Sequence, residues 1–392
     1  MSAEEIRADL WGQVQAKSAE DLYREQPYLR TVVDFLARNV AQLGLHTFKR
    51  DGESRERMRD HPVARLLADP NPQQSTYDLV SALVSSLALY DRALLWVKPD
   101  PATLEPGMLR VIPESWLVDT ADSSPYAVGR YVVEPPGGNA FEISAFDVIE
   151  FHGWNPTDLR VGVSPVEALK SILAEQLSAA EYRQQNWAKG GRVGAYLTRP
   201  AGAPKWTNEA RTRFQKGWAA SYTGPGNHVG GVPLLEDGIE LKRVGFSAKE
   251  DDYIEGSKLA LQTVASVYHV NPTMLGLLDN ANYSNVKEFR RGLYGDTLGP
   301  LIAMIEGKLN RFLVRRFHDH ESVYVEFNVA EKLAGSFEEQ AAHFASALNS
   351  GWLTVNEVRA MMNRPAIEGG DVLRTPLNMG EAAPPAADPT EQ

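Results

Sequence analysis

The fold is decided by two stretches of sequence, SPVEALKSILAEQLSAAEYRQQNWAKGG (164–191) and SAKEDDYIEGSKLALQTVASVYHVNP (247–272). Each begins with a serine that can cap a helix, followed three residues later by a glutamate that can complete a capping box. Apolar residues recur at helical spacing in both. The first helix would be roughly 37 Å long at about 1.5 Å per residue. The sequence therefore predicts a long helix that leaves a core and a second that returns to it.

Between these helices, residues 192–246 predict a compact α/β insert. A strand-like run at 195–199 leads into a short helix that Thr207 can cap. After a glycine-rich turn, two strand-like runs are joined at Glu236-Asp237-Gly238. Asp-Gly between such runs is a hairpin signal.

The chain before residue 164 predicts helices followed by sheet. Helical spacing extends from about Pro27 to Leu43 and from about Tyr77 to Tyr90, and Ser75 can cap the second helix. Five short β-branched or aromatic runs, separated by proline and glycine, then fill residues 93–152. That pattern predicts a small antiparallel β unit.

The chain after the second long helix begins with a polar loop, LLDNANYSN (277–285). A helix of roughly 30 residues is then expected to reach Phe317, with a kink at Pro300, because proline removes a backbone hydrogen bond. A strand at 322–328 and two capped helices, from Ser336 and Thr354, follow. The predicted fold class is α+β.

Composition excludes several functions. The chain has 392 residues with 40 Lys+Arg against 51 Asp+Glu, a net charge of −11, which argues against a broad basic face that grips duplex DNA. The absence of cysteine excludes a thiolate zinc site and a cysteine nucleophile. No stretch approaches the roughly 18 apolar residues that a membrane span needs.

The motif search predicts no enzyme, no cofactor and no metal. Gly224–Gly230 lacks the spacing and the lysine of a phosphate loop, and Gly162-Val-Ser164-Pro lacks the closing glycine of a nucleophile elbow. His318-Asp319-His320-Glu321 is the one local metal-like cluster. Adjacent side chains on an extended segment point to opposite faces, so a solvated linker is the favoured interpretation.

One basic segment stands out in this acidic chain. Residues 285–317 hold seven basic residues against three acidic ones. The segment is either a solvated face that pairs with acidic neighbours or a face that meets phosphates or adjacent subunits. The basic residues are Lys287, Arg290, Arg291, Lys308, Arg311, Arg315 and Arg316.

Seven stretches in this order resemble the portal (head–tail connector) proteins of tailed bacteriophages, in the class with capsids of the lambdoid long-tailed type. They cover nearly the whole chain, and the main departure is a short N-terminal arm. The stretches are residues 28–48, 61–79, 87–97, 148–173, 234–259, 270–313 and 348–371.

The resemblance implies a ring, usually of twelve copies, at a single capsid vertex. It also implies a division of this chain into the parts of that fold. These are a flexible N-terminal arm (1–26), a wing (27–163), a stem helix (164–191), a clip (192–246), a second stem helix (247–270), a tunnel loop region (271–285), a kinked channel helix with a wing-return strand (286–330), a crown (331–371) and a disordered tail (372–392).

The function implied by the resemblance is a channel for packaging and ejection of double-stranded DNA. The implied partners are further copies of the chain, DNA in transit, terminase, a head–tail adaptor, the major capsid protein and scaffold, in the virion and, during assembly, in the host cytoplasm. The implied DNA-facing loop residues are Asp279, Asn280, Asn282, Tyr283, Ser284 and Asn285, with Lys287, Arg290 and Arg291 beside them. The implied docking residues for terminase or adaptor, in the clip, are Glu236, Asp237, Lys242 and Arg243.

Three alternatives stay open. The chain could form another ring of the phage neck or tail, or the portal of a defective prophage or gene-transfer particle. A hydrolase with a scattered active site is the remote alternative, which converging Ser, His and Asp side chains in a pocket would reveal.

Overall fold

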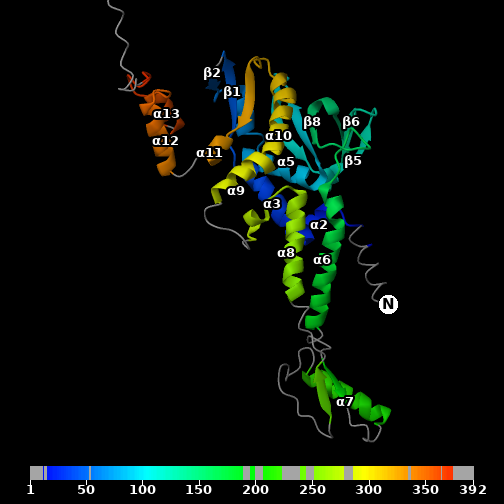
Figure 1. The fold of residues 1–392 in the computed structure, drawn as a ribbon. Coiled ribbons are helices and arrows are strands. Elements are labelled where there is room, and N and C mark those ends of the chain that lie inside the picture. Colours follow the sequence, from blue (N-terminus) through cyan, green and yellow to red (C-terminus); the bar gives the residue numbers. More distant parts are fainter. Residues whose placement is uncertain are drawn as a thin grey trace, which may run out of the picture. The chain divides into compact units, whose positions relative to one another are not determined.

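A computed structural model describes residue 12 and residues 16–52, 54–188, 195–198, 206–222, 239–243, 251–277, 286–333, 337–362 and 364–373. The chain divides into two compact units, Met1–Phe327 and Asn328–Gln392. Figure 1 shows the order of the elements.

The two long helices are confirmed. Helix α6 spans Pro165–Ala188 and helix α8 spans Asp251–Val267, and the two pack against each other. Ser164 caps α6, because its Oγ accepts the N–H of Val166 at 3.2 Å and donates to the carbonyl of Leu89 at 2.5 Å. The predicted start of α8 at Ser247 lies outside the described residues.

Among the described residues, four helices precede the β unit: α2 (Ala19–Glu25), α3 (Pro27–Ala41), α4 (Pro62–Ala68) and α5 (Thr76–Tyr90). Helix α5 begins with the predicted cap, a full capping box between Ser75 and Asp78. The expectation of a flexible arm over 1–26 is wrong for α2. Ser18 caps this helix, and the side chain of Leu22 is fully buried, so the segment is held by the core.

The predicted antiparallel β unit is confirmed as two three-stranded sheets. One has the order β4-β3-β8, and the other has the order β5-β6-β7. Buried residues of both sheets, among them Leu94, Tyr131 and Ile143, pack in one hydrophobic cluster. The strands are β3 (Arg92–Pro99), β4 (Pro106–Ile112), β5 (Leu117–Ala121), β6 (Arg130–Val133), β7 (Phe141–Ser144) and β8 (Val148–His152).

A third sheet joins distant parts of the chain. Strand β1 (Leu45–Asp51) lies between β2 (Ser54–Arg57) and the predicted late strand, β11 (Val323–Phe327). In its register, Phe48 faces Tyr324, and the two rings stack with centroids 5.7 Å apart.

The predicted kink exists, but Pro300 does not make it. Helix α9 (Val286–Gly292) passes into a π-helical turn, η5 (Leu293–Thr297), before α10 (Gly299–Phe312) and the short η6 (Val314–Arg316). Pro300 stands in the first turn of α10, where its missing N–H breaks no hydrogen bond. The change of direction therefore precedes the proline, at a π segment, which is a common cause of helix kinks.

In the predicted insert, β9 (Ala195–Thr198) pairs with β10 (Glu240–Arg243), and α7 spans Asn208–Tyr222. Thr207 caps α7 as expected, because its Oγ accepts the N–H of Ala210. The expected strand before Glu236 and the hairpin turn lie outside the described residues.

The second unit contains α11 (Val329–Leu333), α12 (Phe337–Asn349) and α13 (Val355–Met361). The predicted capping box between Thr354 and Glu357 is present. A small core of Ala347, Leu353 and Val358 holds this unit together.

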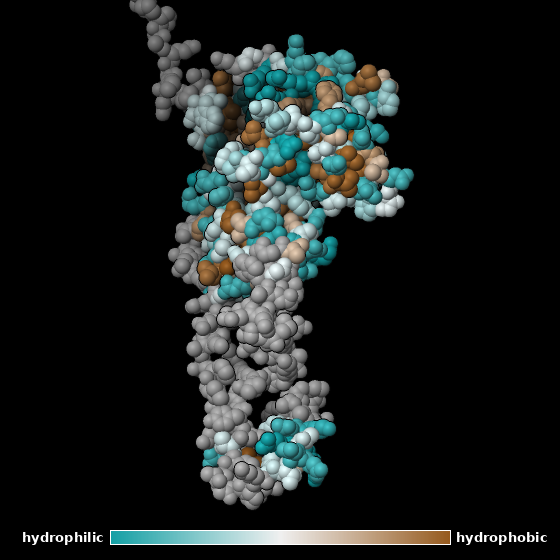
Figure 2. All heavy atoms as spheres, turned by 90° about the vertical axis from the view of Figure 1, so that its right-hand side faces the viewer, coloured by the Kyte–Doolittle hydropathy of each residue, from teal (hydrophilic) through white to brown (hydrophobic). Residues whose placement is uncertain are grey.

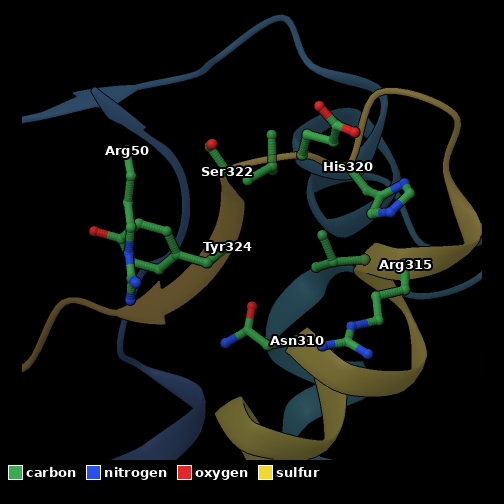
Figure 3. A pocket seen from close by; sticks show the side chains of 9 residues that line it. Arg50, Asn310, Arg315, His320, Ser322 and Tyr324 are labelled. Carbon is green, nitrogen blue, oxygen red and sulfur yellow. The ribbon is translucent and has the colours of Figure 1, made fainter. Parts of the chain in front are cut away.

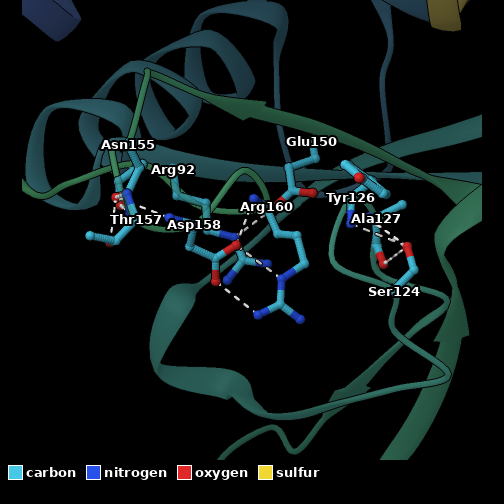
Figure 4. A network of polar contacts seen from close by, with 10 residues as sticks. Arg92, Ser124, Tyr126, Ala127, Glu150, Asn155, Thr157, Asp158 and Arg160 are labelled. Carbon is cyan, nitrogen blue, oxygen red and sulfur yellow. Dashed lines mark hydrogen bonds and ion pairs between the residues drawn. The ribbon is translucent and has the colours of Figure 1, made fainter.

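A polar network fixes the segment that leads from β8 into α6. Figure 4 shows Arg92 beside Glu150, and Asp158 paired with Arg160. The Asn155 side chain accepts the N–H groups of Thr157 and Asp158. The pairing with Arg160 lowers the pKa of Asp158 to about 2. The loop that starts the long helix is therefore held by its own side chains.

Candidate functional site

The six polar loop residues that the resemblance assigns to DNA lie outside the described residues. Residues 278–285 contain all of them: Asp279, Asn280, Asn282, Tyr283, Ser284 and Asn285. The structure describes the two ends from which this segment starts and to which it returns, at Leu277 and Val286.

The first end is a short capped turn after α8. Tyr268 donates its hydroxyl hydrogen to the carbonyl of Ala88 at 2.8 Å, and burial raises its pKa. His269 has a left-handed backbone (φ 55°), which stops the helix. Asn271 then caps η3 (Pro272–Leu275) by accepting the N–H of Thr273. The turn contacts α3, so this end is attached to the core.

The second end is held at the π-helical turn. The Gln42 amide donates to the hydroxyl of Tyr294 at 3.0 Å. Burial raises the pKa of Tyr294, while the Gln42 bond and the charge of Arg290 oppose that rise. Thr297 donates to the carbonyl of His269 at 2.5 Å. This last bond links the π-helical turn to the residue that ends α8.

The basic residues beside this segment are partly described. Lys287 lies on α9, whereas Arg290 and Arg291 are exposed there. Arg291 lies 3.5 Å from Glu288, and both side chains are more than 70% exposed, so this pair contributes at most about 1 kcal/mol. Both arginines remain accessible to an anion.

Of the four predicted docking residues in the insert, two lie within the described residues and two lie outside them. Lys242 and Arg243 lie on β10, paired in register with Tyr196 and Ala195. Glu236 and Asp237 lie outside the described residues.

The His318–Glu321 cluster makes no metal site in the part of the chain that the structure describes. His318 is bound by the carboxylate of Glu105, which accepts both its backbone N–H (2.8 Å) and a hydrogen bond at Nδ1 (2.6 Å). These bonds lower the pKa of Glu105. His320 bonds the carbonyl of Phe317 instead. His318 and His320 therefore have separate partners.

The sequence did not predict a polar hollow of about 450 Å³ that both Arg50 and Arg315 line. Arg315 belongs to the basic segment noted from the sequence, but Arg50 lies far away in the chain. Only the pairing of β1 with β11 brings the two into one place.

No helix in the described ranges is long and apolar enough to cross a membrane.

Comparisons with known proteins find similarity to phage portal proteins along most of the chain. A model of the phage portal protein family matches residues 27–363. The probable portal protein of Streptomyces phage phiC31 is 25% identical over 89% of this chain and 77% of its own length. The portal protein of Enterobacteria phage HK97 is 23% identical, over 87% and 79%. A chain from the neck of a native gene transfer agent (GTA) particle, computed with C12 symmetry, has the same fold, with a TM-score of 0.63 and 21% identity over 90% of this chain and 95% of its own.

Proposed function

This chain belongs to the phage portal protein family, and from that membership we propose that twelve copies form a ring through which double-stranded DNA passes. The observation that carries the proposal is the family match over residues 27–363. The C12 symmetry with which the similar neck of the native GTA particle was computed supports the copy number. Such a ring would stand at one vertex of a capsid, in a phage or in a gene-transfer particle.

The net charge of the chain supports a channel through which DNA slides rather than a site that binds DNA tightly. Twelve copies at −11 each carry −132 formal charges. DNA that is gripped through many phosphates releases counterions and binds tightly, which would slow its movement. An acidic ring repels the duplex and leaves it free to slide. Polar groups such as Asn282 and Ser284 would touch the backbone without reading bases.

The geometry around residues 278–285 supports their role as the channel loop. The described segments on its two sides are linked by the bond from Thr297 to the carbonyl of His269. The exposed Arg290 and Arg291 on α9 would contact phosphates or the acidic surface of a neighbouring copy.

Exposed apolar side chains offer contacts between copies. Phe146 and Trp154 are more than three-quarters exposed on the first unit. On the face in Figure 2, hydrophobic side chains form small groups among hydrophilic ones. Interfaces that close a ring are heterologous, so such groups would meet a different surface of the next copy.

We assign the insert, residues 192–246, to docking of the packaging motor and later of a head–tail adaptor. No nucleotide-binding motif is found in the sequence, so the energy for packaging would come from that partner. Glu236, Asp237, Lys242 and Arg243 are the residues proposed to meet it. Major capsid protein and scaffold would surround the ring during assembly.

Blocking the proposed channel should stop packaging. The chain has no cysteine, so Ser284→Cys gives a single labelling point in the loop. Modification with a bulky polyethylene glycol maleimide should reduce the DNase-protected DNA in particles at least tenfold, because the twelve labels would fill the path of the duplex. The control, Ala102→Cys with the same label on an exposed turn of the first unit, should leave packaging unchanged. Equal packaging with both labels would contradict the placement of the loop.

A further inference from the structure

A cationic hollow lies between the β1-β2-β11 sheet and the end of the α10 helix (Figure 3). It has a volume of about 450 Å³, and none of the residues that line it is among the DNA-facing or docking residues assigned above. Arg50 from β1 and Arg315 from η6 stand on opposite sides of it, and Asn310 lies between them. His320 and Ser322 line its rim.

Arg50 has no carboxylate partner among the described residues of the sheet. Arg50 and Arg55 are directly opposite each other in the β1–β2 register, so two cations share one face. Glu326 neutralises only Arg55, at 2.9 Å. The guanidinium of Arg50 lies instead over the ring of Tyr324, 5.0 Å from its centroid. This stacking holds the charge in place and leaves the N–H edges available.

On the opposite side of the hollow, Asn310 is held by hydrogen bonds and the charge of Arg315 is not neutralised by an ion pair within the described residues. Asn310 holds the end of α10 against β11, because its side-chain amide accepts the N–H of Val325 at 2.7 Å and donates to the carbonyl of the same residue at 2.9 Å. Arg315, one turn later, is exposed and has no ion-pair partner within the described ranges. His320 uses Nδ1 for the carbonyl of Phe317, which leaves Nε2 free.

Glu321 is the one carboxylate that lines the hollow. With both arginines charged, the hollow therefore keeps a formal charge of +1 when His320 is neutral and +2 when it is protonated. An anion is the ligand that such a site favours, in a chain whose total charge is −11.

We propose that this hollow binds a phosphate group, with Arg50 and Arg315 as its two charged donors. Guanidinium groups match phosphate oxygens in pairs, with charge-assisted hydrogen bonds. The donors come from opposite sides, which suits a tetrahedral group that presents oxygens in both directions rather than a planar carboxylate. Because Arg50, Arg315 and Ser322 are all exposed, the phosphate can be part of a longer chain.

The phosphate is taken to belong to the DNA backbone, and this identification rests on the proposed function. The alternative source of the same chemistry is a small free phosphate. An acidic peptide would be a different ligand, and its binding in place of phosphate would overturn the proposal.

The test compares Arg50→Gln/Arg315→Gln with the unchanged full-length protein in the same oligomeric state. Binding of a fluorescent 30-base-pair duplex is followed by anisotropy at several salt concentrations, and binding of inorganic phosphate by ³¹P NMR. The double variant should weaken duplex binding at least tenfold at about 0.1 M salt, and the slope of log K against log salt should fall by about 2, roughly one for each arginine. Glu321→Gln should strengthen binding severalfold.

Arg24→Gln/Arg30→Gln is the matched control. It removes the same charge from exposed positions, and Arg30 lies over the ring of Tyr23, 5.4 Å from its centroid, as Arg50 lies over Tyr324. Duplex affinity should change less than twofold. Equal losses in the two double variants, or binding of polyglutamate without either phosphate ligand, would overturn the site. Loss of inorganic phosphate binding alone would keep the site and assign it to a small phosphate. The oligomeric state of each variant is measured separately. Loss of the ring and loss of phosphate binding therefore give different results.

Discussion

Gly162→Ala should destabilise the first unit by about 3 kcal/mol, the upper end of the usual range for overpacking. A Cβ at Gly162 would stand 2.6 Å from Cγ of Asp91 and closer still to the backbone carbonyl oxygen of that residue. Asp91 cannot move away easily, because its carboxylate accepts the N–H of Val163 at 3.1 Å and its backbone is left-handed (φ 51°). Urea unfolding, followed by circular dichroism at fixed protein concentration, measures the change.

Gly256→Ala in α8 is the control for this substitution. Nothing lies within 4 Å of a Cβ at that position. Alanine in a helix interior should therefore stabilise the protein by about 0.5–1 kcal/mol. If the two variants have the same stability, Asp91 does not hold the start of the long α6 helix as described.

Arg92→Met should cost about 3 kcal/mol at neutral pH, because it leaves two partly buried carboxylates without their cation. The Arg92 side chain is 8% exposed. Its Nε donates to Glu150 at 2.9 Å, its Nη1 lies 3.4 Å from Glu114, and Tyr131 donates to the other oxygen of Glu150 at 2.8 Å. Methionine fills the space of the stem of Arg92 but cannot balance either charge.

The cost of Arg92→Met should shrink as pH falls. Burial already raises the pKa of Glu114 above its usual value, and the charge of Arg92 opposes that rise. Without Arg92, the pKa of Glu114 in the folded protein should rise further. The loss of stability is then complete at a pH above this folded-state pKa and disappears at a pH below the pKa that Glu114 has in the unfolded chain. Urea titrations at pH 7.5 and pH 5 measure this, and a loss that grows toward pH 5 would contradict it.

Arg130→Met is the matched control for Arg92. Arg130 also pairs with two carboxylates, Asp122 and Glu142, but all three side chains are exposed. Surface pairs contribute little to stability, so this variant should unfold nearly as the parent does. Equal losses in the two variants would show that burial of the Arg92 network does not matter.

Local sequence signals predicted most helix starts and strands. Ser75 and Thr354 form the expected capping boxes, because the residues that make a cap lie within one turn of each other. Alternation of apolar residues predicted the late strand, which is Val323–Phe327 in the structure. The expected kink at Pro300 was misplaced, because proline tolerates the first turn of a helix and the π turn before it has no simple sequence signal.

Features that depend on distant residues could not be predicted from local patterns. The hollow needs Arg50 and Arg315 on neighbouring elements, and only the β1–β11 register brings them together. Helix α2 was expected to be flexible, because its single buried side chain, Leu22, gives little periodicity in a polar segment. The channel loop and the docking residues Glu236, Asp237, Lys242 and Arg243 were assigned from resemblance, and their roles stay predictions.

The central claim is the closed ring, and native mass spectrometry of the full-length protein, with negative-stain imaging of the same sample, tests it most directly. The chain has a mass of 43.3 kDa. We expect one species of twelve copies, near 520 kDa at twelve times that mass, with a central hole in the images. A chain that stays monomeric, both alone and when co-expressed with its capsid protein and scaffold, would contradict the account.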